Sequence, residues 1–235
     1  MAFRIQREFD AVISAGRRPT VPRSDANAQA PIKLNLGCGG RFVTDWINVD
    51  YSLGARIASV PLLGPAVRRT HLFDVSWDPR IVLHDLRRPL PWPGESVDVA
   101  YASHTLEHLS RDDGRRLIGE CHRVLRKNGI VRILVPDLRS LARSYMDGLL
   151  RADDFVEALG VLYDRSKNPI KHRLYPLLQF PHQCMYDTAR LLDILDATGF
   201  ESSSRAGFDS GIDDIRVIEL EDRTRDAVIV EGHKR

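Results

Sequence analysis

The sequence has little cysteine and no long apolar run. Its 235 residues include three cysteines, Cys38, Cys121 and Cys184, without a CxxC spacing, which argues against a disulfide framework and a zinc ribbon. No stretch approaches the roughly 18 apolar residues of a membrane-spanning helix, and the charged N-terminus lacks the apolar core of a secretory signal. We therefore expect a cytoplasmic protein with reduced thiols and no membrane span.

An excess of one charge sign is also missing. The chain has 34 basic and 32 acidic residues and a formal net charge of +2. Nucleic-acid binding depends on a basic surface that contacts phosphates, so we do not expect a nucleic-acid partner. The G-K-[ST] of a P-loop and the G-x-G-x-x-G of dinucleotide-binding folds are both absent.

Segments with strand and helix patterns alternate along the chain. Strands are expected at residues 32–36, 46–50, 81–86, 97–102, 130–135 and 227–231, and helices at 112–127 and 188–198. Residues 215–220 also have a strand-like pattern. This alternation predicts an α/β fold with a Rossmann-like, doubly wound, mostly parallel sheet and helices on both faces.

Composition separates an N-terminal arm from one domain. Residues 1–30 end in a stretch with few large apolar residues, typical of an arm or linker, and residues 31–235 are predicted to form a single domain. Within it, residues 51–80 are predicted to be an insertion with little regular structure. Residues 138–187 are rich in aromatic and basic side chains, which suit contacts with an acceptor molecule.

Glycines and acidic residues follow the predicted strands. Gly37 and Gly39 come directly after the first strand, where a backbone without side chains can approach a ligand or simply form a tight turn. Asp50 and Asp85 end the next two strands. Ligands of such sheets bind beyond the carboxyl ends of the strands, and carboxylates there could accept hydrogen bonds from ribose hydroxyls and from an adenine amino group.

Four segments together carry a family resemblance. LNLGCGGRFVTDWINVD, HDLRRPLPWPGESVDVAYASHTLEHL, HRVLRKNGIVRILVPDL and LLDILDATGF resemble, in this order, class I S-adenosylmethionine-dependent methyltransferases. The likeness is to the bacterial, methyltransferase type 11-like group with L-G-C-G, W-x-N-V-D, H-D-L and S-x-x-x-E-H motifs. It implies a seven-stranded sheet and S-adenosyl-L-methionine as cofactor. The cofactor-binding residues that it implies are Leu36, Gly37, Cys38, Gly39, Asp50, Asp85, Leu86 and Ser103.

The resemblance also assigns a role to each part of this set. The glycine turn would line the methionine half, Asp50 would hold the ribose, and Asp85 with Leu86 would hold the adenine end. Ser103 and His104 would lie near the sulfonium. One departure is that only ten residues separate Gly39 from Asp50, so the first helix must be very short or absent, and the insertion at 51–80 could cover that face.

A second group of polar residues follows the fourth strand. If the chain is helical there, His104, Glu107 and His108 stand at i, i+3 and i+4 on one face. They could hold a divalent metal or form a solvated helix start. Metal-dependent plant small-RNA 2′-O-methyltransferases have a similar E-x-x-E-H motif and a distant histidine. That likeness implies His182 as a further ligand of Mg²⁺ or Mn²⁺, with His104 as fourth ligand or general base.

Asp137 completes the candidate catalytic set of His104, Glu107, His108 and Asp137. It follows Pro136 and could act as a base or cap the next helix. We expect methyl transfer to an oxygen acceptor, a saccharide hydroxyl in polysaccharide or glycolipid biosynthesis, with or without a metal. The alternatives are a small natural-product acceptor and a cofactor-binding relative without activity. A homo-oligomer is compatible with the sequence.

Overall fold

One seven-stranded sheet organises the residues that this computed structural model describes, which are 30–60, 77–162 and 180–235. The strand order is β3-β2-β1-β4-β5-β7-β6. The strands are β1 (Lys33–Leu36), β2 (Ile47–Asp50), β3 (Val82–Leu83), β4 (Val97–Ser103), β5 (Leu125–Pro136), β6 (Phe200–Ser204) and β7 (Ala227–Lys234). All neighbours pair in parallel except β7, which runs antiparallel to β5 and β6. The predicted fold class is thus confirmed.

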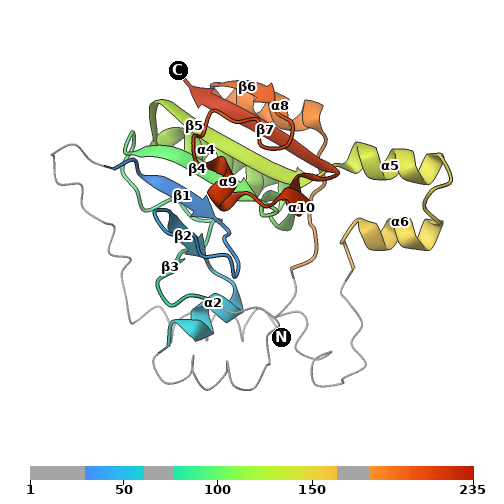
Figure 1. Cartoon of the computed structure of the whole chain (residues 1–235), viewed down its shortest axis with the longest axis horizontal. Coiled ribbons are helices and arrows are strands. Elements are labelled where there is room, and N and C mark those ends of the chain that lie inside the picture. Colours follow the sequence, from blue (N-terminus) through green and yellow to red (C-terminus); the bar gives the residue numbers. More distant parts are fainter. Residues whose placement is uncertain (1–29, 61–76, 163–179) are drawn as a thin grey trace.

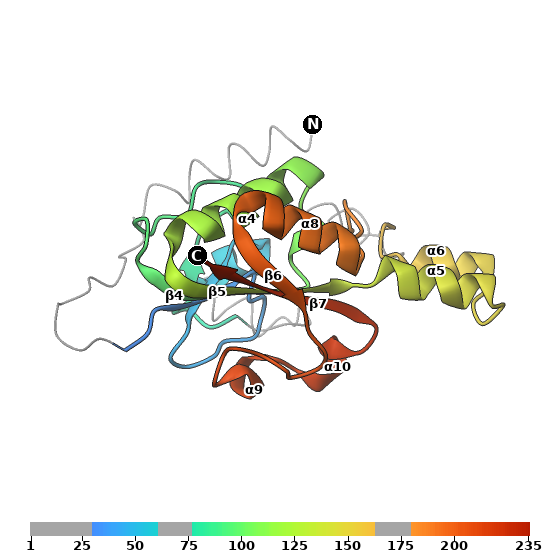
Figure 2. The ribbon, with the colours of Figure 1, turned by 90° about the horizontal axis from the view of Figure 1, so that it is seen from above.

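Two helices cover one face of this sheet, as Figure 2 shows. They are α4 (Arg111–Val124) and α8 (Thr188–Thr198). Ser110 caps the first turn of α4, and Gly199 ends α8 in the left-handed conformation. Their buried residues pack against the even-numbered side chains of β1 and β4 in the larger core cluster. The apolar residues at helical spacing in both predicted helices therefore pack against the sheet.

The opposite face is covered by the connection between β6 and β7. This connection holds two short helices, α9 (Ile215–Ile218) and α10 (Glu221–Thr224), below the sheet in Figure 2. Ile212, Ile215 and Ile218 pack with Val99 and Tyr101 of β4 in a second core cluster. Within the described residues no helix lies between β1 and β2, so residues from the C-terminal part of the chain cover the face that a first helix would cover.

Three local predictions need correction. Residues 215–220 are not a strand, because the isoleucines at three-residue intervals turn toward the sheet as a short helix. The predicted helix at 112–127 ends at Val124, because buried Leu125 has extended backbone and pairs with Val97. The strand predicted at 81–86 is only two residues long, since it pairs at one edge with β2 alone.

Three further helices follow strands β2 and β5. Helix α2 (Leu53–Ala58) falls in the predicted insertion 51–80, where little regular structure was expected; residues 61–76 lie outside the described part. Helices α5 (Leu138–Met146) and α6 (Ala152–Ala158) follow β5 and extend away from the sheet (Figure 1). Neither buries a residue fully. The arm at 1–30 falls almost wholly outside the described residues.

Candidate functional site

The turn after β1 packs tightly against the end of β4. The N–H groups of Gly37 and Cys38 both donate to the carbonyl of Val49. Gly37 has φ +73°, and a Cβ atom there would lie 2.3 Å from the hydroxyl oxygen of Thr105. The side chain of Thr105 donates in turn to the carbonyl of Leu36. Only glycine satisfies both the backbone angle and this close approach.

Asp50 is buried at the end of β2 and organises the surrounding backbone. Its carboxylate accepts hydrogen bonds from the N–H of Gly39 at 2.8 Å and the N–H of Ser52 at 2.7 Å. The same carboxylate therefore joins the glycine turn to the start of α2. Each carboxylate oxygen can accept more than one hydrogen bond, which leaves acceptor capacity for the ribose hydroxyls that the sequence assigned to Asp50.

Asp85 lies two residues after β3 and is already paired. Arg87 donates to it through its backbone N–H and through two guanidinium nitrogens, at 2.8 to 3.0 Å. Burial opposes ionisation of Asp85, but these hydrogen bonds and the charge of Arg87 outweigh it and lower the pKa of the carboxyl group. Leu86 beside it packs against the larger core cluster.

His104 stands in a strained position directly after β4. Its φ angle is +49°, which is uncommon for a residue with a side chain. Its Nδ1 lies 3.4 Å from Oε1 of Glu107, and its Nε2 lies 3.4 Å from the carbonyl oxygen of Arg223. The predicted helical spacing is therefore wrong in detail, because His104 precedes the 3₁₀ turn η1 (Leu106–His108).

Glu107, His108 and His182 nevertheless come together. One ligand atom from each of the three lies within 4.8 Å of the others, and the rings of His108 and His182 have their centroids 4.9 Å apart. The Glu107 residue is 0% exposed, and neither of its carboxylate oxygens has a hydrogen-bond partner in the described structure. Apart from the His104 ring at 3.4 Å no cationic group pairs with it among the described residues, and since a buried carboxylate without a hydrogen bond is costly, this cluster suits a cation.

Backbone hydrogen bonds explain how residues so distant in sequence meet. The N–H groups of Gln183 and Cys184 donate to the carbonyl of Glu107, and the side chain of Gln183 donates to the carbonyl of His108. These three bonds hold the segment before α8 against η1. The carbonyl of Gly160 accepts a hydrogen bond from the N–H of His182, which ties the same segment to the chain that follows α6.

The surroundings of His182 also determine which ring nitrogen is free. Nδ1 lies 2.7 Å from the carbonyl oxygen of Leu159, and since a carbonyl only accepts, Nδ1 carries the proton. In the neutral ring Nε2 then keeps its lone pair, the arrangement that metal-ligating histidines favour. A Cβ on Gly160 would lie 2.7 Å from this ring. Sequence reasoning missed Gly160, although a glycine directly after a helix was a visible signal.

His108 is the second half-buried imidazole of the pair. Burial lowers its pKa, an effect that the nearby Glu107 carboxylate opposes and that His182 reinforces. Its Nδ1 is buried without a hydrogen-bond partner in the described structure. A neutral imidazole with an unused nitrogen is the form that binds a divalent metal.

Asp137 has a capping role. It is the N-cap of α5, and its carboxylate accepts a hydrogen bond from the N–H of Arg139 at 2.9 Å. The alternative interpretation of Asp137 as a helix cap thus describes its contacts. The base role remains a prediction.

A small open pocket lies beside the glycine turn. It is lined by Gly37, Cys38 and Ser103, residues that the sequence assigned to the cofactor, and by Arg223 from the β6–β7 connection. The Ser103 hydroxyl is buried, and apart from the neighbouring Tyr101 hydroxyl it has no hydrogen-bond partner in the described structure. A glycine turn and a buried hydroxyl fit the polar methionine end of S-adenosyl-L-methionine.

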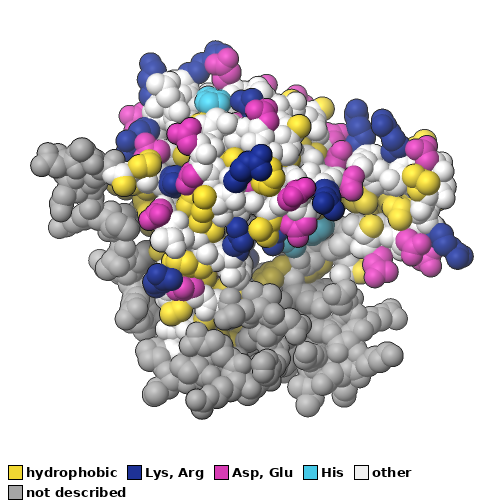
Figure 3. Space-filling model, in the orientation of Figure 1, with side chains coloured by type: hydrophobic (Ala, Val, Ile, Leu, Met, Phe, Trp, Pro, Cys, Tyr) yellow, Lys and Arg dark blue, Asp and Glu magenta, His cyan; other side chains and the backbone are white. Residues whose placement is uncertain are grey.

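The surface gives no sign of a phosphate-binding face on the side shown in Figure 3. Basic and acidic side chains of the described residues alternate there without a large area of one sign. Among the described residues, no helix is long and apolar enough to cross a bilayer.

Comparison with known proteins identifies the domain. Residues 34–133 match the sequence profile of a family described as "Methyltransferase domain". This segment runs from β1 through most of β5 and includes the glycine turn, Asp50, Asp85, Glu107 and His108, but not His182. A comparison with curated proteins gave no match.

Solved structures with similarity to the chain include several methyltransferases. A Thermotoga maritima SAM-dependent methyltransferase, described as a possible histamine N-methyltransferase, is 17% identical, with 88% of this chain and 83% of that chain covered and a TM-score of 0.41. YcgJ from Bacillus subtilis is 13% identical, with coverages of 98% and 99% and a TM-score of 0.48. Magnesium protoporphyrin IX methyltransferase from Synechocystis PCC 6803 is 13% identical, with coverages of 98% and 83% and a TM-score of 0.46.

With TM-scores below 0.5, these structures place no residue and no substrate for this chain. The family match is the finding that identifies the enzyme class, and the strand order, with β7 antiparallel between β5 and β6, gives the fold. Residues 34–133 form a methyltransferase domain, and the enzyme uses S-adenosyl-L-methionine as its methyl donor.

Proposed function

We propose that the enzyme methylates a hydroxyl group of a saccharide, in polysaccharide or glycolipid biosynthesis, and that a divalent metal at Glu107, His108 and His182 assists the transfer. The observation that carries this proposal is the Glu107 carboxylate, which is fully buried beside two imidazoles and has no hydrogen-bond partner in the described structure. A saccharide offers neighbouring hydroxyls that can bind one metal ion together.

The spacing of the three groups supports this assignment. Ligands about 2.1 Å from one ion stand roughly 3 to 4.2 Å apart, so a set within 4.8 Å needs only a small side-chain adjustment. Two imidazoles and one carboxylate suit Mn²⁺ or another transition ion by ligand preference, and cellular abundance favours Mg²⁺. Either ion would lower the pKa of a hydroxyl that it binds.

Residues of the chain would supply the remaining functions. S-adenosyl-L-methionine provides a methyl group on a sulfonium, which makes the methyl carbon electrophilic. The acceptor oxygen forms a bond to this carbon as the carbon–sulfur bond breaks, and the hydroxyl proton passes to a base. His104 is the base that we propose, because its ring lies beside Glu107 and is partly exposed. Holding both reactants in line is the main contribution of such a site.

Each of the predicted cofactor residues would contact one part of S-adenosyl-L-methionine. Leu36, Gly37, Cys38 and Gly39 would hold the methionine half and Ser103 the region of the sulfonium. Asp50 would bind the ribose, and Asp85 with Leu86 would contact the adenine. Burial first, and the charge of Asp50 second, raise the pKa of the Cys38 thiol, so Cys38 contacts a ligand as a neutral group. Residues 138–187 would cover the acceptor; of these, residues 163–179 lie outside the described part of the chain.

Changing Asp50 to asparagine should weaken binding of S-adenosylhomocysteine by roughly 1.5–3 kcal/mol, because a charged acceptor for two hydroxyls is lost. Isothermal titration calorimetry measures this difference. Asp45→Asn makes the same charge change in the exposed part of the β1–β2 connection and should leave the affinity unchanged. Equal affinities for the Asp50→Asn variant and the wild-type enzyme would remove Asp50 from the cofactor site.

The acceptor proposal is tested with a panel of mono- and oligosaccharides, natural-product phenols and a short RNA. Turnover is followed as formation of S-adenosylhomocysteine, with and without chelator. We expect turnover on saccharides with adjacent free hydroxyls, a loss of at least about 10²-fold with chelator, and recovery with Mn²⁺ or Mg²⁺. Turnover on a phenol or RNA alone would refute the saccharide assignment, and full activity in excess chelator would refute the metal.

A further inference from the structure

The pocket beside the glycine turn has an unusual contributor. Part of its described lining comes from β1, β4 and the turn after β1, where the methionine end of the cofactor is expected, but Ile218, Leu220 and Arg223 come from the connection between β6 and β7. This connection covers the sheet face on which no first helix lies among the described residues. It can therefore supply a cofactor contact from the side where a first helix would lie.

The charges that line the pocket favour an anion. Its described lining includes two arginines, Arg41 and Arg223, and no acidic side chain. Arg41 is already engaged, since its guanidinium donates to the carbonyls of Ile218 and Val217 at 3.0 Å. Burial raises the pKa of the Tyr101 hydroxyl to about 12, so at neutral pH it keeps its proton.

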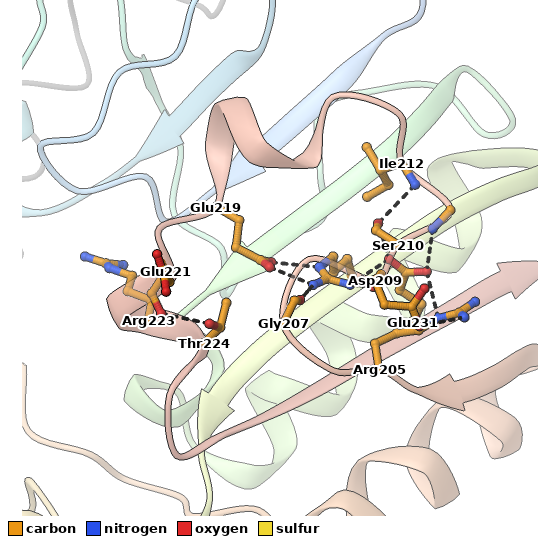
Figure 4. Close-up of polar contacts among 12 residues, drawn as sticks. Arg205, Gly207, Asp209, Ser210, Ile212, Glu219, Glu221, Arg223, Thr224 and Glu231 are labelled. Atoms are coloured by element: carbon orange, nitrogen blue, oxygen red, sulfur yellow. Dashed lines mark hydrogen bonds and ion pairs between the residues drawn. The ribbon is translucent and has the colours of Figure 1, made fainter.

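The guanidinium of Arg223 has no partner among the described residues, while the backbone before it is fixed. No described residue forms a hydrogen bond or ion pair with its side chain, and Figure 4 shows this side chain extending away from the polar cluster around Glu219. The chain just before it is fixed by Arg41 and by Glu219, which pairs with buried Arg132. A cation held in this way can meet a ligand in the pocket without a large rearrangement.

A second polar group, the Ser103 hydroxyl, also lies in the pocket. Ser103 is 7% exposed, and apart from the neighbouring Tyr101 hydroxyl its side chain has no hydrogen-bond partner in the described structure. It ends β4 and lines the same pocket as Arg223. Together they offer one cation and one neutral donor, a combination suited to a carboxylate.

We propose that Arg223 binds the carboxylate of the methionine moiety of S-adenosyl-L-methionine, so that the β6–β7 connection completes the cofactor site in place of a first helix. The binding involves charge-assisted hydrogen bonds, with Ser103 as an additional donor. The proposal assigns Arg223 to the cofactor and not to the acceptor.

The test measures affinity by calorimetry, with no turnover required. Two ligands are compared, S-adenosylhomocysteine and its decarboxylated analogue S-adenosyl-3-thiopropylamine, which lacks only the carboxylate. Arg223→Gln should weaken binding of the first by about ten- to a hundredfold and leave binding of the second within about twofold. Arg223→Lys should retain part of the affinity, because it keeps the charge.

Arg225→Gln provides the matched control, because Arg225 is exposed two residues further on and forms only a 3.7 Å pair with Glu221. It should bind both ligands as the wild-type enzyme does. An equal loss for both ligands in Arg223→Gln would mean a general disturbance of the pocket, and no loss for either would leave Arg223 to another ligand. Either result overturns the proposal, as does an equal effect of Arg225→Gln.

Discussion

Replacing Glu107 with glutamine is expected to abolish binding of Mn²⁺ and to lower turnover by about 10²-fold or more. The substitution keeps the shape of the side chain and removes its negative charge. Without that charge, His108 and His182 remain as two neutral nitrogens, which bind hard divalent ions weakly. Calorimetry with Mn²⁺ and the turnover assay on the best acceptor measure the two effects.

The same variant separates a metal site from a structural role of Glu107. In the metal-free protein the buried carboxylate has no hydrogen-bond partner in the described structure, so its neutralisation should not lower the free energy of unfolding. Added Mn²⁺ should raise the melting temperature of the wild-type protein and leave that of Glu107→Gln unchanged. Glu157→Gln, an exposed change on α6, should behave as the wild type. Wild-type Mn²⁺ affinity in Glu107→Gln would refute the site.

The sequence allowed the candidate metal ligands to be named but not their supports. Glu107 and His108 are neighbours after a predictable strand, and His182 precedes a predictable helix. The contact between these two regions depends on backbone hydrogen bonds from Gln183 and Cys184 to Glu107, which leave no side-chain pattern. The tautomer of His182 depends on the backbone carbonyl of Leu159, and a backbone contact does not depend on the residue type at that position.

The fold was predictable wherever one face of an element is buried. The helix α8 and the central strands have regular apolar spacing, and the structure contains them nearly as predicted. The β6–β7 connection was not predictable, because its short helix α9 begins with apolar Ile215 and Val217 on either side of charged Arg216, an alternation that is also typical of a strand. What decides between the two is the uncovered sheet face beside β1, a tertiary feature. Arg223 was missed for the same reason.

A buried ion cluster holds this connection on the sheet. Arg132 of β5 is 0% exposed and pairs with Glu219 at 2.7 Å and with Glu231 at 2.9 Å. Its guanidinium also donates to the carbonyls of Gly207 and Asp209. Figure 4 shows these partners converging from β7 and from the connection. All the charges are therefore satisfied only as long as the arginine is present.

Arg132→Met should lower the free energy of unfolding by about 3–5 kcal/mol, because it leaves buried Glu219 without its cation and Glu231 with Arg205 alone. Urea denaturation measures the change. Arg126→Met is the matched control on the same strand, where Arg126 pairs with Asp98 at 3.0 Å near the surface. The control should cost less than about 1 kcal/mol. An equal, small loss in both variants would show that the buried cluster contributes little.

The pH dependence of stability should become weaker in the Arg132→Met variant. In the wild type, burial opposes ionisation of Glu231, but hydrogen bonds from Ser210 and Gly211 and the pairing with Arg132 outweigh it and lower its pKa. This carboxylate therefore stabilises the fold above its unfolded pKa of about 4.5, and that contribution is lost as the pH falls through the lower folded value. Without Arg132, the hydrogen bonds from Ser210 and Gly211 and the pair with Arg205 remain, so the pKa of Glu231 should rise toward its unfolded value. The stability difference between variant and wild type should then shrink as the pH is lowered through the unfolded value of about 4.5. If the difference stays constant over this range, the loss in the variant comes from packing and not from uncompensated charge.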